Sequence, residues 1–172
     1  APNIKSMFNG FVVQGGKDGT DEPGTNVPLL AIWPGTIPGG QVSHRLIDFT
    51  DILPTFAEIA GIPKPPDYGI LDGISFYGDM TGNGPVNQRS TIYCAYNSDP
   101  PTPNKKWVRW VQNDTYKLYD TSRHEQAGQF IRLEKGKPDG PPLDLNQLTP
   151  EERVIIKQFA RALIKNRQAS IY

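Results

Sequence analysis

The sequence predicts an α/β fold that ends in a small antiparallel sheet covered by one long helix. A continuous apolar run over Val27–Pro34 is typical of a strand that is buried on both faces. Several short runs rich in β-branched and aromatic residues lie between residues 91 and 133, and the turn residues between them indicate antiparallel strands. A helix-capping sequence at Thr149 precedes the last apolar stripe and predicts a C-terminal helix.

The N-terminal part of the chain contains one predicted helix after a stretch of loop. Residues 1–25 are rich in Gly, Asn, Asp and Lys and have no helical period, so we expect loop there. Apolar residues recur at helical spacing within Leu46–Ala60. We expect this helix to have Thr50 or Asp51 as its N-cap and Gly61 as its C-cap.

A subdomain boundary is predicted near residue 87. Pro63–Asn87 is rich in Gly and Pro and is expected to cross as a long loop between two structural units. Residues 1–87 are then the C-terminal part of a larger domain, and residues 88–172 form a C-terminal subdomain of antiparallel sheet and helix. The strands predicted in that subdomain are Thr91–Tyr96, Trp107–Val111, Thr115–Tyr119 and Gln129–Leu133.

The last helix has the clearest local signals. Thr149 is the expected cap, Pro150 occupies the first helical position, and Glu152 completes a capping box. The apolar face, which runs to about Arg167, is expected to pack across the antiparallel sheet and consists of Ile155, Phe159, Ala162 and Leu163.

Composition narrows the classes of function. The 172 residues include 18 basic and 18 acidic side chains, so no net charge favours nucleic acid or an anionic membrane surface. The apolar run at Val27–Trp33 is much shorter than the roughly 20 residues that a membrane-spanning helix needs. We therefore expect neither nucleic acid nor membrane as a partner. Cys94 is the single cysteine and forms no internal disulfide.

Several motifs follow one another in a fixed order. Gly16-Lys17 is followed at set spacing by Glu22, Gly24 and Pro28, before the apolar run that ends at Trp33-Pro34-Gly35. Later motifs are Pro38-Gly39-Gly40, Asp51-Ile52-Leu53-Pro54-Thr55, Ala60-Gly61, Asp72-Gly73-Ile74-Ser75, Val108-Arg109 and Tyr116-Lys117-Leu118. In this order and spacing the chain resembles the C-terminal portion of the sulfatase family, with the sharpest matches between Gly16 and Ser75.

The resemblance implies an alkaline-phosphatase-like α/β fold, of which this chain supplies the final sheet elements and the C-terminal subdomain. It also implies a formylglycine nucleophile, made from a C/S-x-P-S-R motif, and a calcium ion held by carboxylates. Neither set of residues is found here. Cys94, the single cysteine, is followed by Ala95-Tyr96-Asn97-Ser98, which lacks the proline and arginine of the modification motif. We expect Cys94 to be a buried packing group and the nucleophile and metal ligands to come from the upstream half of the same protein.

Lys17 is the candidate catalytic and substrate-binding residue. The family lysine at this position implies that its ammonium contacts the sulfate, where negative charge grows during ester hydrolysis. At about 4 Å and an effective dielectric near 20, such a contact is worth roughly 4 kcal/mol before desolvation. Glu22 is expected either to support the Lys17 loop or to be an exposed turn carboxylate. Asn26 departs from the family, in which many members carry arginine there, and this removes a possible ion pair.

The two histidines have different expected roles. His44 precedes the predicted helix and is expected to be a surface or capping group. His124 lies where some sulfatases bring a substrate-contacting histidine from the C-terminal subdomain, and it is the second candidate for substrate binding. The aromatic residues Trp107, Trp110, Tyr116 and Tyr119 are expected to pack in the core rather than to line a sugar pocket.

Three hypotheses about function follow. The first is a C-terminal fragment of a sulfatase that in its complete form hydrolyses sulfate esters on a sulfated carbohydrate or aryl substrate, with the isolated chain inactive. The second is a fragment of a related phosphonate or phosphate monoester hydrolase, because the residues that distinguish them lie upstream. The third is a noncatalytic module that binds sulfated glycans. Family resemblance alone suggests a periplasmic, extracellular or lysosomal location.

Overall fold

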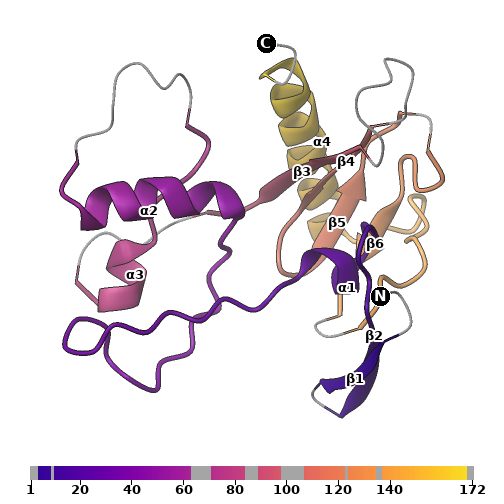
Figure 1. Ribbon diagram of the computed structural model, residues 1–172. Helices are drawn as coiled ribbons and strands as arrows, with labels where there is room; N and C mark the ends of the chain where they lie inside the picture. Colours follow the sequence, from indigo (N-terminus) through magenta and orange to yellow (C-terminus); the bar gives the residue numbers. More distant parts are fainter. Residues whose placement is uncertain are drawn as a thin grey trace. The chain divides into compact units, whose positions relative to one another are not determined.

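The computed structural model describes residues 4–8, 10–62, 71–83, 89–97, 107–122, 124–134 and 137–169. The chain forms two compact units, of which one combines Ala1–Pro28 with Tyr93–Tyr172 and the other is Leu29–Ile92 (Figure 1). The N-terminal segment therefore belongs with the C-terminal sheet, although some 65 residues separate them along the chain. The boundary near residue 87 was predicted for the complete enzyme and stays a prediction.

A four-stranded sheet forms the centre of the first unit, as the sequence predicts. Its strands lie in chain order and are β3 (Ile92–Tyr96), β4 (Val108–Gln112), β5 (Tyr116–Tyr119) and β6 (Phe130–Arg132). The pairs β4–β5 and β5–β6 are antiparallel, with Trp110 opposite Tyr119 and Leu118 opposite Phe130. The side chain of Asn113 accepts the backbone N–H groups of residues 115 and 116, which fixes the turn between β4 and β5.

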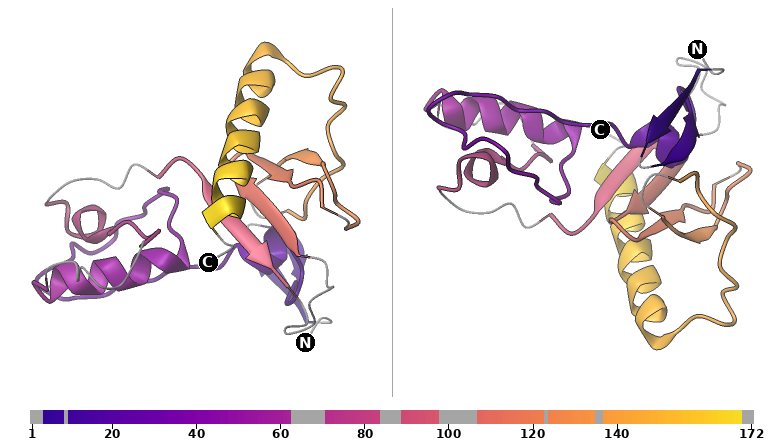
Figure 2. Two further views of the ribbon diagram at one scale, coloured as in Figure 1. Left: turned by 90° about the horizontal axis from the view of Figure 1, so that it is seen from above. Right: turned by 90° about the horizontal axis from the view of Figure 1, so that it is seen from below.

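The helix α4 (Pro150–Ala169) covers one face of this sheet, and its capping box is present (Figure 2). The Thr149 hydroxyl accepts the Glu152 N–H at 3.2 Å, and the Glu152 carboxylate accepts the Thr149 N–H at 2.9 Å. The predicted helix and its apolar stripe are confirmed. The buried residues of this core are Val111, Tyr116, Leu118, Phe130, Leu148, Phe159 and Leu163.

The opposite face of the sheet has its own small core, because side chains alternate along each strand. Trp110, Tyr119 and Ile131 are buried there, and Cys94 packs half-buried against them. The packing role expected for Cys94 agrees with this position. Among the predicted aromatic core residues, Trp107 differs, because 43% of it is exposed beside the Arg109 guanidinium.

The expectation of loop over residues 1–25 is wrong. β1 (Lys5–Phe8) and β2 (Phe11–Gln14) pair as an antiparallel hairpin in which Lys5 lies opposite Gln14, and α1 (Glu22–Thr25) follows as a single turn. The dipeptide Asn9-Gly10 between two short apolar runs is a common hairpin signal. The polar composition of residues 1–25 favoured the prediction of loop over that of a hairpin.

The second unit contains the predicted helix. A 3₁₀ turn, η1 (Phe49–Asp51), leads directly into α2 (Ile52–Ile59). Asp51 is the N-cap residue of α2, as one of the two expected caps, but its side chain makes no capping bond there, and the capping box lies at Asp48 before η1. Gly61 takes the left-handed conformation with φ 64°, which is typical of the expected helix end. The predicted crossing loop contains a short helix, α3 (Tyr77–Thr81), and the parts at 63–70 and 84–87 lie outside the described residues.

Polar residues from two sequence motifs organise the interior of the second unit. Asp51 is fully buried, forms a two-pronged ion pair with Arg89, and accepts the Ile74 N–H at 2.7 Å. The buried Thr55 hydroxyl donates to the Asp51 carbonyl and accepts the Phe76 N–H. Gly73 lies so close to this turn that a Cβ there would be 1.9 Å from the Thr50 carbonyl oxygen. The two motifs therefore hold each other in place.

The buried strand predicted over Val27–Pro34 is wrong for this chain. The structure has no strand between residues 26 and 33, all of which it describes. Leu30 and Ile32 are each 87% exposed. A strand needs a neighbour to satisfy its backbone N–H and C=O groups, and no described segment pairs with this one.

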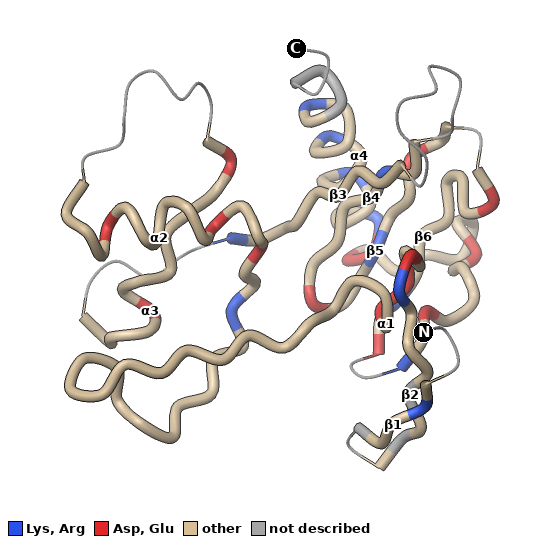
Figure 3. The backbone as a smooth tube through the Cα atoms, viewed as in Figure 1, with Lys and Arg blue, Asp and Glu red and all other residues tan. Residues whose placement is uncertain are grey.

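Charged residues of both signs are interspersed along the backbone of the first unit (Figure 3). Among the described residues of the second unit, acidic side chains outnumber basic ones. Within the part of the chain that the structure describes, no helix is both long enough and apolar enough to cross a membrane.

Candidate functional site

The segment from Gly16 to Asn26, here called the Lys17 loop, is folded on itself through close backbone contacts. The Gly19 N–H donates to the Gly16 carbonyl at 2.8 Å, and a Cβ at Gly24 would lie 2.4 Å from the Gly19 carbonyl oxygen. Asp18 adopts a left-handed conformation with φ 70°, which Asp tolerates better than most residues. Glycine is therefore required at position 24 for the loop to close.

A buried lysine connects this loop to the sheet. Lys117 lies in the middle of β5 and is completely buried, on the face opposite α4. Its ammonium donates to the Thr20 carbonyl at 2.9 Å and to the Asp139 carboxylate at 2.8 Å. The other oxygen of Asp139 accepts the Glu22 N–H at 2.9 Å. Two residues of the first unit thus bind the loop backbone at two points.

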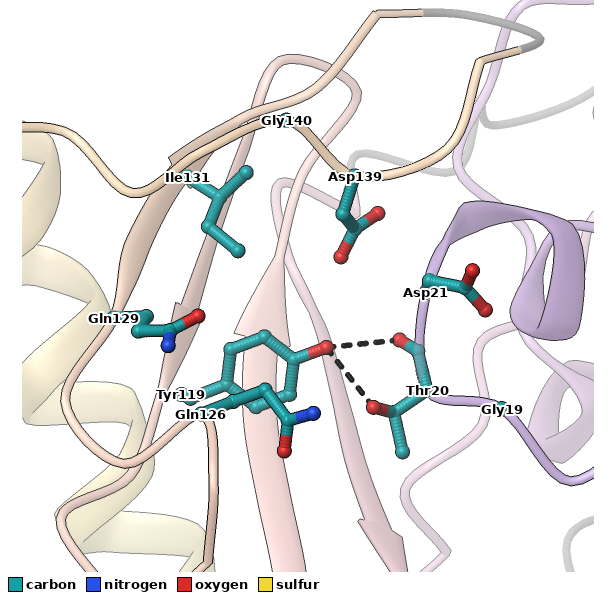
Figure 4. A pocket seen from close by; sticks show the side chains of 9 residues that line it. All are labelled: Gly19, Thr20, Asp21, Tyr119, Gln126, Gln129, Ile131, Asp139 and Gly140. Carbon is teal, nitrogen blue, oxygen red and sulfur yellow. Dashed lines mark hydrogen bonds between the residues drawn. The ribbon is translucent and has the colours of Figure 1, made fainter.

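Tyr119 makes a third connection, and Figure 4 shows its hydroxyl directed at Thr20. The hydroxyl donates to the Thr20 carbonyl at 3.1 Å and lies 3.0 Å from the Thr20 hydroxyl. Burial is the main cause that raises the pKa of Tyr119 well above its ordinary value, so the phenol stays protonated and remains a donor.

A pocket of about 370 Å³ opens beside these contacts. The side chains that line it are mostly polar, and the nine residues are Gly19, Thr20, Asp21, Tyr119, Gln126, Gln129, Ile131, Asp139 and Gly140 (Figure 4). Both oxygens of Asp139 are already hydrogen-bonded, so this carboxylate is part of the wall and not a free acceptor.

Lys17 itself does not line this pocket. Its side chain is 78% exposed, and its ammonium lies 3.4 Å from the carboxylate of the adjacent Asp18. The loop therefore fixes the backbone of Lys17 and leaves its amine free to meet a ligand or further polypeptide. The predicted contact of Lys17 with a sulfate stays a prediction.

Glu22 is buried rather than exposed. One of its carboxylate oxygens accepts the Asn26 side-chain amide at 2.7 Å, and the other is buried without a hydrogen-bond partner. The uncharged amide of Asn26 thus donates a hydrogen bond to Glu22 where an arginine would form an ion pair. A buried Glu22 that binds Asn26 fits the expected role of supporting the Lys17 loop. Whether this support matters for catalysis stays a prediction.

His124 is brought to an internal cluster and not to the pocket lining. Its Nε2 lies 2.9 Å from Asp120, and its side chain is only 4% exposed. Asp120 also accepts from the Ser122 hydroxyl at 2.5 Å and lies 3.8 Å from Arg109. The predicted substrate contact of His124 therefore stays a prediction, and His44 is exposed as expected.

The residues described here do not fit the calcium ion that the sulfatase resemblance implies. Among them, no group of three or more His, Cys, Asp or Glu side chains converges closely enough to hold a metal ion. The most buried acid, Asp51, is paired with Arg89, and Asp139 is paired with Lys117. No step of the chemistry is therefore routed through a metal held by this chain.

Sequence reasoning missed Asp139 and gave neither Lys117 nor Tyr119 a role at this site. A lysine between Tyr116 and Leu118 in a predicted strand was a weak signal, because the alternation of a strand places it on the same face as Tyr119. Nothing in the sequence connected it to Thr20 or Asp139, which lie 97 and 22 residues away.

Comparison with known proteins gives one family over most of the chain. The family model described as N-sulphoglucosamine sulphohydrolase, C-terminal, matches residues 18–169. The N-acetylgalactosamine-6-sulfatase of Canis lupus familiaris is 38% identical over 93 residues, which are 54% of this chain and 17% of that protein. The search of solved structures found no significant match.

Other relatives carry the same kind of name. The ulvan-active sulfatase of Formosa agariphila is 48% identical over 61 residues, covering 36% of this chain and 12% of that protein. Arylsulfatase G of Mus musculus is 29% identical over 163 residues, covering 87% of this chain and 30% of that protein. The chain therefore spans less than a third of the length of each of these relatives.

Proposed function

Because the chain belongs to the family of N-sulphoglucosamine sulphohydrolase C-terminal domains, we propose that it is the C-terminal part of a sulfatase that hydrolyses sulfate esters. The observation that carries this proposal is the family match over residues 18–169, which includes the Lys17 loop from Asp18 onward and the whole C-terminal sheet. Its substrate is a sulfated carbohydrate or an aryl sulfate. Relatives named for N-acetylgalactosamine-6-sulfate, ulvan and aryl sulfates support this class.

In this proposal Lys17 is the cation that this chain contributes to the reaction. Hydrolysis of a sulfate monoester places negative charge on the non-bridging oxygens and on the departing oxygen. An ammonium on a rigid backbone stabilises that charge without reorganising. The amine of Lys17 is exposed, and the backbone of its loop is held by Lys117 of the sheet at Thr20 and by Asp139 at Glu22. This arrangement supports the proposed role.

The remaining machinery is proposed to come from the upstream half of the same protein. This half supplies the formylglycine nucleophile and the carboxylates that bind calcium, because the Cys94 sequence lacks the modification motif and the buried carboxylates of Asp51 and Asp139 are paired with Arg89 and Lys117. The exposed apolar segment Val27–Trp33 is proposed to pair with this upstream half in the complete protein. The isolated chain is therefore expected to be inactive.

The test is to express the complete reading frame and to measure hydrolysis of an aryl sulfate and of sulfated oligosaccharides. Lys17→Ala should lower kcat/KM by about 100- to 1,000-fold, the range found when one donor to a developing oxyanion is removed. Lys157→Ala, which removes an exposed lysine on α4, is the matched control and should leave the rate unchanged. Equal activity of the Lys17→Ala variant and the wild type would refute the role of Lys17.

Two comparisons separate the other candidate functions. Faster hydrolysis of an aryl phosphate or phosphonate than of the aryl sulfate would identify the parent as a phosphorus ester hydrolase. Binding of a sulfated oligosaccharide by the isolated chain, together with no hydrolysis by the complete protein, would identify a noncatalytic module.

A further inference from the structure

We propose that Lys117 and Asp139 are positioning residues that hold the Lys17 loop in its reactive geometry, an inference that rests on the proposed function. Neither residue touches the reacting atoms in this proposal. Both act through the backbone of the loop that carries Lys17.

The need for such a device follows from the exposure of Lys17. Its side chain is 78% exposed, and among the residues that the structure describes its amine is hydrogen-bonded to the neighbouring Asp18 alone, so packing does not fix the position of the amine. A lysine of this kind is directed mainly by the position of its Cα atom. The backbone of residues 16–26 therefore decides where the positive charge lies.

The contacts that fix this backbone come from distant parts of the first unit. Lys117 donates to the Thr20 carbonyl, three residues after Lys17, and Asp139 accepts the Glu22 N–H, five residues after it. The ion pair between Lys117 and Asp139, at 2.8 Å, joins the two points. Loop and sheet are thus tied by one continuous chain of charge-assisted hydrogen bonds.

Burial makes this connection stiff. Lys117 is completely buried, and its ammonium lies 5.9 Å from the centre of the Trp110 ring and 5.7 Å from that of Tyr119. The Asp139 side chain is 11% exposed. Because the pair is largely buried, removing either member leaves the other charge poorly compensated. Core packing alone does not account for the ammonium, because an apolar side chain would fill the same space without binding the loop.

The first experiment measures the loop directly in the 172-residue chain by hydrogen–deuterium exchange. Lys117→Met keeps the length of the side chain and removes its charge, and Asp139→Asn keeps the size and replaces an acceptor by a donor that faces Lys117. Both variants should exchange the amides of Glu22 and Asn26 at least about tenfold faster than the wild type. The amide of Tyr119, which donates to Gln129, should keep its protection and shows that the sheet is folded.

The matched control is Arg132→Met, which breaks a different ion pair on the same sheet. Arg132 pairs with Glu152 of α4, on the face away from the Lys17 loop. This variant should leave the exchange of Glu22 and Asn26 unchanged. Unchanged exchange in both Lys117→Met and Asp139→Asn, with the sheet amides protected, would overturn the proposal.

The second experiment is a double-mutant cycle in the complete protein. Lys117→Met or Asp139→Asn should lower kcat/KM for an aryl sulfate by about 10- to 100-fold, as expected when a catalytic group is misplaced by about 1 Å. In the Lys17→Ala background, the same substitution should lower it by less than about threefold, because the group being positioned is already absent.

The outcomes separate positioning from general support and from failure of the proposed function. Equal losses in both backgrounds would mean that the pair acts on the whole fold and would overturn positioning. Faster loop exchange with unchanged kcat/KM would overturn it as well. A complete wild-type protein that hydrolyses no sulfate ester would overturn the proposed function and the catalytic part of this inference, whereas the exchange experiment would still decide whether the pair holds the loop.

Discussion

At the scale of single residues, several motif positions are explained by packing rather than by chemistry. Asp51 and Thr55 are both buried and bind the backbone of the segment around Ile74 and Phe76. Gly73 fits against the Thr50 carbonyl only because it has no side chain. These residues recur in the sulfatase pattern of the sequence, and here they form the frame of the second unit.

The pair Asp51–Arg89 gives a prediction about stability. Asp51→Ala removes the completely buried carboxylate that accepts the Ile74 N–H and pairs with Arg89, and should destabilise the second unit by about 3–5 kcal/mol. Arg45→Met breaks the more exposed pair with Asp79 in the same unit and should cost at most about 1 kcal/mol. Urea denaturation followed by circular dichroism compares the two variants. A loss below that of Arg45→Met would contradict the buried role of Asp51.

Gly24 gives a second prediction at this scale. A methyl group there would approach the Gly19 and Gly16 carbonyl oxygens to 2.4 and 2.6 Å, so Gly24→Ala must open the Lys17 loop. The expected result is faster exchange of the loop amides and an aryl sulfatase rate about 10- to 100-fold lower in the complete protein. Gly39→Ala, where an added Cβ meets no atom within 4 Å, is the control and should behave as wild type.

At the scale of elements, α4 shows how local signals and packing reinforce each other. The capping box fixes its first turn, and the Arg132 guanidinium on β6 binds the same Glu152 carboxylate. The backbone N–H of Thr149 is the main cause that lowers the pKa of Glu152 to about 2, and the hydrogen bond from Arg132 adds to it. Glu152 therefore stabilises the first turn of α4 and also binds that turn to β6 of the sheet.

This shift predicts how stability depends on pH. Because the folded pKa of Glu152 lies below its ordinary value of 4.5, its contribution is fully present above pH 4.5 and is lost as the pH falls towards 2. Glu152→Gln should therefore lower the melting temperature at neutral pH, and its difference from the wild type should shrink through that window. Thermal melts at a series of pH values measure this. A difference that stayed constant down to pH 2 would contradict the assignment.

The apolar face of α4 predicts how much substitutions on this helix change the free energy of unfolding. Phe159 is 1% exposed and packs edge-on against Phe130 with ring centres 6.5 Å apart. Phe159→Ala should cost about 3–5 kcal/mol of unfolding free energy in the first unit. Ile164→Ala on the same helix, where the side chain is 61% exposed, should change it by about 0.5 kcal/mol or less. Similar losses from both would mean that α4 does not pack as described.

At the scale of the whole molecule, the apolar segment Val27–Trp33 is unusual because its large side chains are exposed. Leu29, Leu30, Ile32 and Trp33 are between 41% and 87% exposed and follow one another with no pairing strand among the described residues. Contiguous apolar surface of this kind marks a place where further polypeptide packs. We interpret it as the surface that meets the upstream half of the complete sulfatase.

This interpretation predicts self-association of the isolated chain. At micromolar concentration the wild-type chain should sediment as oligomers or aggregate, and replacing Leu30 and Ile32 by lysine should shift it towards monomer. The same substitutions should leave the melting of the sheet unit unchanged, because both residues belong to the second unit. A wild-type chain that is strictly monomeric would show that the segment is not a docking surface.

Local sequence patterns were enough to predict the elements whose signals lie within a few residues. The capping box of α4, the four β-type runs and the stripe of α2 depend on residues within a few positions of one another, so periodicity and cap residues were enough to find them. The sulfatase motifs were also contained in the sequence, and the family match confirmed the resemblance to sulfatases.

The contacts between residues that lie far apart in the chain follow from the fold and not from any local pattern. Lys117 sits in the strand that the sequence predicted, but its bonds to Thr20 and Asp139 depend on how the loop and the sheet come together. Val27–Trp33 has the composition of a buried strand, and it forms none because a strand exists only with a neighbour that accepts and donates its backbone hydrogen bonds. The composition of a segment determines whether it is able to be buried or to pair as a strand. Which other segment it packs against depends on distant parts of the chain, and no local pattern specifies those.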